Sequence, residues 1–261
     1  MNPAPLILWL NKPIIKGISF FVPVAFNKLK RKYIRYKNEK EYAFFRYIAV
    51  QKGKVTEKER NKFFLKIADN RTLQGQIFEL MDEVLRSRST TAAATISLIV
   101  SENLEEDAET LIISDDDHIL LEALDRISET EVLFFWYLAN KIYTDQIPSK
   151  SSPDSDLNFI PKPVGGSPVY KYTPPTGETK ISLRNRSITV NSEGAIAMVN
   201  DLINRRLFLP CTETVAIYDG VASTTNCFSV GRVTKIAWQK IDTALQAIDG
   251  TDVKSIMPLK S

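Results

Sequence analysis

The stretch EVLFFWYLANKIY, residues 131–143, sets the main constraint on how this chain folds. Its apolar side chains fall on nearly every side of a helix, so a helix formed here is predicted to lie at the centre of a core. Ser128 and Glu131 have the spacing of a capping box, in which a hydroxyl and a carboxylate satisfy free amides of the first helical turn. The helix is therefore expected to begin just after Ser128, with other segments packed around it.

The region before this stretch, from residue 28 onward, also shows helical spacing. In KEYAFFRYIAV and NKFFLKIA the apolar residues lie three and four apart, and Thr56 and Glu59 form another capping-box pattern. TTAAATISLIVSEN is rich in small and apolar residues, which suits close packing, and ENLEEDAETL is expected to form an acidic turn or short helix. LQGQIFELMDEVLRSRS places one apolar face on a helix, made of Ile77, Leu80, Met81, Val84 and Leu85. Together these segments predict an antiparallel helical array.

The run Asp115, Asp116, Asp117 and His118 contains residue types that bind metal ions. It immediately precedes ILLEALDRI, however, and acidic residues are favoured as the N-cap and in the first turn of a helix. Consecutive side chains also diverge on a regular backbone. The run is therefore interpreted as the start of a helix, with no metal and no cofactor expected.

Residues 147–178 hold seven of the 13 prolines and three of the ten glycines of the chain. Proline fixes the backbone in extended and turn conformations and excludes long helices. This composition predicts a long connection between two parts of the protein.

After the connection the periodicity changes. KISLRNRSITV alternates as a strand does, SEGAIAMVNDLINRRLF has helical spacing, and TVAIY and CFSV are two short strand candidates joined by a turn at Asp219 and Gly220. TKIAWQKIDTALQAI then carries one apolar helical stripe, made of Ala237, Ile241, Ala244, Leu245 and Ile248. With residues 117–144 supplying two earlier helices, this order of elements is the one that a winged helix requires.

The predicted fold class is therefore mainly α, a helical array followed by a winged-helix-like α+β part with a small β-hairpin. The predicted organisation comprises an apolar amphipathic N-terminal segment (1–27), a helical domain (28–146), the Pro/Gly-rich connection (147–178), the winged-helix-like part (179–250, packed with 117–144) and a tail (251–261).

The first of these segments is apolar from residue 5 to residue 26 and runs directly into basic residues. Asn11, Lys12, Pro13, Lys16 and Pro23 interrupt it, so it is not expected to span a membrane, and its charge follows the apolar part instead of preceding it as in a signal peptide. Two alternatives remain: the segment packs on a protein core, which is favoured, or it lies in a membrane interface. The expected location is cytoplasmic, at the inner membrane face in the second case. The basic side chains available for an electrostatic, membrane or partner contact are Lys28, Lys30, Arg31, Lys32 and Arg35.

Charge is distributed unevenly along the chain. Residues 1–75 carry 17 basic and 5 acidic side chains (net +12), residues 76–146 carry 4 and 16 (net −12), and the remainder carries 13 and 10, giving the total of +3. Such asymmetry steers association with a complementary surface. The two charged parts either neutralise each other within one fold or meet between two copies.

The two cysteines, Cys211 and Cys227, are too few for a disulfide framework and lack a metal-ligand spacing. A disulfide between them requires their segments to pair, and in a reducing cytosol free thiols are expected.

The stretches DLINRRLFLP and GRVTKIAWQKI, with Val233 and Thr234 at matching positions, resemble bacterial proteins of the abortive-infection alpha type. The resemblance covers the pattern of apolar positions from about residue 61 to residue 248, and the Pro-rich insertion departs from it. It implies a helical region followed by a winged-helix-like part, and a role in bacterial defence against phage.

Neither a catalytic triad nor a phosphate-binding glycine loop is present in the sequence, and the chain has a single histidine. We therefore expect a non-enzymatic interaction protein that contacts a protein partner or a second copy of itself. The alternative is a nucleic-acid-binding winged-helix regulator, for which Arg205 and Arg206 at the end of the expected recognition helix are the candidate contacts. Glu193 and Asp201 on that helix disfavour phosphate binding.

Overall fold

The computed structural model describes residues 44–45, 47–49, 51–53, 56–105, 110–144, 156–160, 168–174, 176–211 and 227–250. The chain divides into two compact units, residues 1–117 and 118–261, with the boundary inside one helix. The predictions for residues 1–27, for the basic residues 28–35, for the strand TVAIY and its turn, and for the tail all concern positions outside the described ones.

The first unit contains three consecutive helices, α4 (Glu57–Asp69), α5 (Arg71–Arg86) and α6 (Thr90–Asn103), and α5 packs against both of its neighbours. The capping box of Thr56 and Glu59 is confirmed at the start of α4. Asn70 ends α4 and caps α5, and Ser89 caps α6. The predicted apolar face of α5 is confirmed at Ile77, Leu80, Met81 and Val84, which are buried, whereas Leu85 is only partly buried.

Helix α6 is buried on most of its surface, although it contains several hydroxyl side chains. Thr95 donates a hydrogen bond to the carbonyl oxygen of Thr91, and Ser97 donates one to that of Ala93, both at 2.8 Å. These bonds within the helix satisfy polar groups that would otherwise be costly to bury. The small side chains therefore let α6 occupy an interior position.

Helix α7 (Asp115–Leu124) crosses the boundary between the units, and its first turn contains the three aspartates, as predicted. The hydroxyl of Ser114 accepts the amide of Asp117 at 3.2 Å, so the capping side chain is this serine and not an aspartate. Asp117 is buried and accepts hydrogen bonds from Asn103 and Ser114. His118 is exposed.

The second unit is built around α8 (Glu129–Tyr143), the helix predicted to be central. The capping box of Ser128 and Glu131 is confirmed, and α8 contacts α9 (Ser192–Asn204), α10 (Arg232–Gly250) and strand β4 (Arg186–Val190). Its buried side chains are Val132, Leu133, Phe134, Phe135, Trp136, Leu138, Ala139 and Ile142. The predicted stripe of α10 is also confirmed at Ala237, Ile241, Ala244 and Leu245, which are buried.

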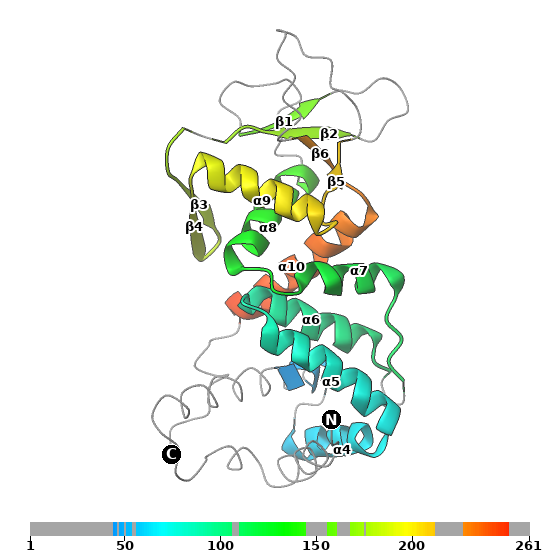
Figure 1. The fold of residues 1–261 in the computed structure, drawn as a ribbon. Coiled ribbons are helices and arrows are strands. Elements are labelled where there is room, and N and C mark those ends of the chain that lie inside the picture. The colour runs from blue at the N-terminus through cyan, green and yellow to red at the C-terminus, as the bar shows by residue number, and fades with distance from the viewer. Residues whose placement is uncertain are drawn as a thin grey trace, which may run out of the picture. The chain divides into compact units, whose positions relative to one another are not determined.

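A four-stranded antiparallel sheet contains β1 (Leu157–Ile160), β2 (Val169–Tyr172), β6 (Cys227–Ser229) and β5 (Leu209–Pro210), in the order β1-β2-β6-β5 (Figure 1). Two of these strands come from the Pro/Gly-rich stretch. CFSV forms β6 as predicted, and its described partners are β2 and β5.

The prediction of one strand in KISLRNRSITV was wrong, because the segment forms two. Strands β3 (Thr179–Leu183) and β4 (Arg186–Val190) pair in a hairpin with Arg184 and Asn185 as its turn. Arg184 has φ +49°, the left-handed conformation that a two-residue hairpin turn demands. Each strand alternates separately, with Ile181 and Leu183 buried in β3 and Ile188 and Val190 buried in β4, so the pattern changes phase at the turn.

The described part of the fold is therefore mainly helical with a small antiparallel sheet and a separate hairpin. None of the described helices combines the length and the apolar composition that crossing a membrane requires.

Replacing the cap of α8 tests how much the central helix depends on its first turn. Ser128→Ala removes the hydroxyl that accepts the amide of Glu131, so we expect the free energy of unfolding to fall by about 1 kcal/mol. Urea unfolding followed by circular dichroism measures this change. Thr130→Ala, an exposed position two residues into the same turn, is the matched control and should change the free energy by less than about half as much. Equal effects of the two substitutions would contradict the capping role.

Candidate functional site

The basic residues proposed for a membrane or partner contact, Lys28, Lys30, Arg31, Lys32 and Arg35, lie outside the described part of the chain. The two arginines proposed for nucleic acid are described and follow α9 directly. They have different environments.

Arg205 makes contacts within the second unit. Its guanidinium donates hydrogen bonds to the carbonyl oxygens of Ala123 at 3.1 Å and Asp125 at 2.7 Å, and it lies 4.0 Å from a carboxylate oxygen of Glu131. It thereby satisfies carbonyl groups at the end of α7, where helices leave acceptors unpaired. The guanidinium of Arg205, a candidate for phosphate binding, is therefore in contact with the end of α7 and with Glu131 of α8.

Arg206 is exposed and has φ +62°. Its amide bonds to the carbonyl of Ile203 and the amide of Leu207 bonds to that of Leu202, the pattern of a Schellman motif. That position is usually glycine, so the arginine occupies a backbone conformation that costs it about 1 kcal/mol.

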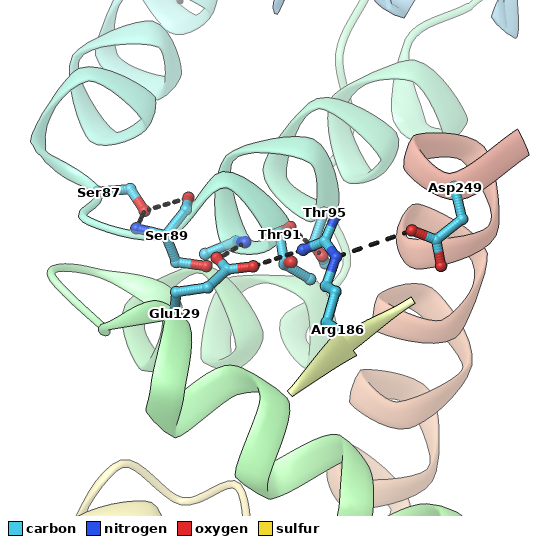
Figure 2. A network of polar contacts seen from close by, with 8 residues as sticks. Ser87, Ser89, Thr91, Thr95, Glu129, Arg186 and Asp249 are labelled. Atoms are coloured by element: carbon cyan, nitrogen blue, oxygen red, sulfur yellow. Dashed lines mark hydrogen bonds and ion pairs between the residues drawn. The ribbon is translucent and has the colours of Figure 1, made fainter. Parts of the chain in front are cut away.

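The polar side chains of α8 define the most connected part of the second unit. At the first turn, the guanidinium of Arg186 on β4 lies between two carboxylates, 2.6 Å from Glu129 and 3.7 Å from Asp249 on α10 (Figure 2). One arginine thus joins α8, β4 and α10. All three side chains are partly exposed.

A second set lies at the middle of α8. The indole Nε1 of Trp136 donates to Asp242 on α10 at 3.0 Å, and Arg184 of the hairpin turn donates to the same carboxylate oxygen at 2.7 Å. The Arg184 guanidinium also lies 5.5 Å from the centre of the Trp136 ring, within the range of a cation–π contact. The strained turn is therefore held against both helices by its own side chain.

A third set lies toward the end of α8, where Tyr137 and Lys141 both donate to the carboxylate of Asp156, next to β1. The ammonium of Lys141 also lies 4.6 Å from the centre of the Tyr137 ring. Tyr172 on β2 is fully buried nearby, and its hydroxyl has no hydrogen-bond partner among the described residues. Burial raises the pKa of Tyr137, as does its hydrogen bond to Asp156, and burial followed by the charge of Asp156 raises the pKa of Tyr172.

This third set contains a phenol, an amine and a carboxylate, residue types that perform acid–base chemistry. Its arrangement favours a structural tie, because each oxygen of Asp156 accepts one hydrogen bond. The phenols of Tyr137 and Tyr172 are protonated at neutral pH, and their raised pKa values move deprotonation further from that range. Among the described residues, no group of three or more His, Cys, Asp or Glu side chains is placed to hold a metal ion.

Sequence reasoning missed the residues that make these ties, namely Asp156, Arg184, Arg186, Asp242 and Asp249. The contacts between Arg186 and Glu129 and between Arg184 and Asp242 join positions 57 and 58 residues apart, so local spacing carries no signal for them. The change of phase between the apolar positions Leu183 and Ile188 is the local signal that could have indicated the turn.

Comparison with known proteins returned no matching family model, no matching curated protein and no matching solved structure.

Tyr143 allows a test of burial at the end of α8. Its half-buried ring stacks on Trp238 at 5.0 Å, and burial, with a smaller effect of Tyr170, raises its pKa to about 12 from 10.0. The unfolded chain therefore releases this proton first as the pH rises, so the stabilisation is complete below pH 10 and is lost toward pH 12. We expect the urea midpoint of the natural chain to fall more steeply over that interval than the midpoint of Tyr143→Phe, which keeps the stacked ring. Parallel curves would contradict the shift.

Proposed function

We propose that this protein acts without catalysis, by presenting a charged surface to another protein, and that the partner is a second copy of the chain. The observation that carries the proposal is the reversal of charge from net +12 in residues 1–75 to net −12 in residues 76–146. Long-range attraction between such parts accelerates and orients association.

The described acidic residues of the first unit support this proposal because many of them face solvent. Glu79 and Asp82 lie three residues apart on α5 and share one face of that helix. Further exposed carboxylates are those of Glu102, Glu105 and Asp115. A basic surface that approaches this unit meets several exposed carboxylates.

Several charged and phenolic side chains of the second unit that could take part in catalysis form hydrogen bonds and ion pairs with one another, which also supports a non-enzymatic role. Arg184, Arg186 and Arg205 each pair with groups of the same unit, and Tyr137 and Lys141 share one carboxylate. These side chains hold helices and strands together, so we propose that the protein acts through its surface.

The resemblance to abortive-infection alpha proteins adds bacterial defence against phage to the proposal. The basic residues that follow the apolar N-terminal segment add contact with an anionic membrane surface.

Self-association is tested by light scattering of the full chain after size exclusion, at low and at physiological salt. We expect a dimer that dissociates as salt rises, and we expect Glu79→Gln combined with Asp82→Asn to raise the dissociation constant about three- to tenfold, since each exposed ion pair contributes up to about 1 kcal/mol. Glu178→Gln combined with Glu193→Gln removes the same number of exposed charges from the second unit and is the matched control. A monomer at every concentration and salt would contradict the proposal.

A nucleic-acid-binding winged helix is the second candidate, and the order of the strands favours it. Helix α9 precedes β5 and β6 in the chain. Of the strands β2, β5 and β6, the one that comes last in the sequence, β6, lies between the other two in the sheet. Winged helices share this order, with a recognition helix before the wing. The segment between β5 and β6, where the wing would lie, is outside the described residues.

Filter binding to mixed oligonucleotides tests this candidate. If α9 contacts phosphates, affinity falls steeply with salt, and Arg206→Gln lowers the slope of that dependence by about one. Lys180→Gln removes an exposed charge from β3 and should leave the slope unchanged. Absence of binding at low salt would exclude the candidate.

A further inference from the structure

The two cysteines lie at the same end of the β5–β6 pair, Cys211 directly after β5 and Cys227 at the start of β6. The antiparallel register pairs Leu209 with Ser229 and Pro210 with Phe228, and one further step of the same register sets Cys211 opposite Cys227. Opposite residues of an antiparallel pair have Cα atoms about 4.5–5.5 Å apart, within the roughly 4.4–6.8 Å that a disulfide spans. Neither of these two described cysteines forms a disulfide in this structure.

The two thiols differ in access. Cys211 is partly exposed, whereas Cys227 is buried. Cys227 belongs to β6, which lies between β5 and β2 in the sheet, and on β2 it pairs with Lys171. Burial raises the pKa of the Cys227 thiol, Cys211 adds to the rise, and Lys171 opposes it. The effect of Cys211 on the pKa of Cys227 agrees with the extended register. Cys211 is the thiol that a dissolved oxidant reaches first, because it is the more exposed of the two.

We propose that Cys211 and Cys227 form a reversible disulfide that fastens β5 to β6. Strand β5 has two residues and lies at the edge of the described sheet, where β6 is its neighbour. So short a strand contributes few ladder hydrogen bonds. A covalent bond at its end holds the pairing and joins the two ends of segment 212–226.

The oxidant is a low-molecular-weight disulfide such as oxidised glutathione. The thiolate of Cys211 attacks one sulfur of the oxidant and releases one glutathione thiolate, leaving a mixed disulfide. The thiolate of Cys227 then attacks the Cys211 sulfur, forms the protein disulfide and releases the second glutathione. Two protein thiols are oxidised and one glutathione disulfide is reduced to two thiols, so electrons and protons balance.

The test uses the full chain, first reduced and then equilibrated at increasing ratios of oxidised to reduced glutathione. After acid quenching and alkylation of free thiols, peptide mass spectrometry should find Cys211 joined to Cys227 within one chain and reversed by dithiothreitol. The urea midpoint should be higher for the oxidised chain than for the reduced chain, because the bond restricts the unfolded state.

Two variants separate the steps. Cys227→Ala should stop at one glutathione on Cys211, whereas Cys211→Ser should acquire none at the buried Cys227. If Cys227→Ala does not fold, Cys211→Ser, at the more accessible position, carries the comparison. The proposal is overturned if the natural chain stops at the mixed disulfide, links only to other copies, keeps both thiols free, or shows the same urea midpoint in both states.

Discussion

The burial of α8 is the constraint on which the second unit depends. Eight apolar side chains of this helix leave water together, and each contributes about 1.5–3 kcal/mol if fully buried, apart from its alanine. A helix that is apolar on nearly all sides needs neighbours in several directions, and α9, α10 and β4 supply them. Polar residues of α8 must then find partners on these neighbours, since water reaches them only in part.

The polar ties along α8 follow from this position. Glu129, Trp136 and Lys141 lie on successive parts of the helix and reach β4, α10 and the start of β1 respectively. Partly exposed ion pairs contribute little net stability, so their main effect is to select one orientation of each element against the helix. The Arg184 turn shows this clearly, because its left-handed backbone is compensated by contacts of the side chain with Trp136 and Asp242.

Features that depend on neighbouring residues could be predicted from the sequence. The capping boxes at Thr56 and Ser128 and the apolar faces of α5 and α10 involve spacings of three to seven residues, and all of them are confirmed. The hairpin of β3 and β4 was missed although the apolar positions change phase between Leu183 and Ile188, because each half alternates as a strand does and the prediction joined them into one. The partners of β6 were missed for another reason: β2 is separated from it by more than fifty residues, and hydrophobic patterning does not encode which strands pair.

The adjacent arginines after α9 show why the number of charged residues in a sequence does not give the charge that the surface presents to a partner. Arg205 and Arg206 are equivalent in composition, yet one guanidinium is bound to the carbonyl groups that end α7 while the other residue is exposed in a left-handed conformation. The exposed one adds more to the field that a distant partner experiences, because the carboxylate of Glu131, 4.0 Å from the Arg205 guanidinium, offsets part of the charge of Arg205. On the first unit, by contrast, Glu79 and Asp82 face solvent on one helix, so their charges act together on an approaching basic surface. This difference in exposure favours the exposed carboxylates of α5 over the end of α9 as the electrostatic contact surface.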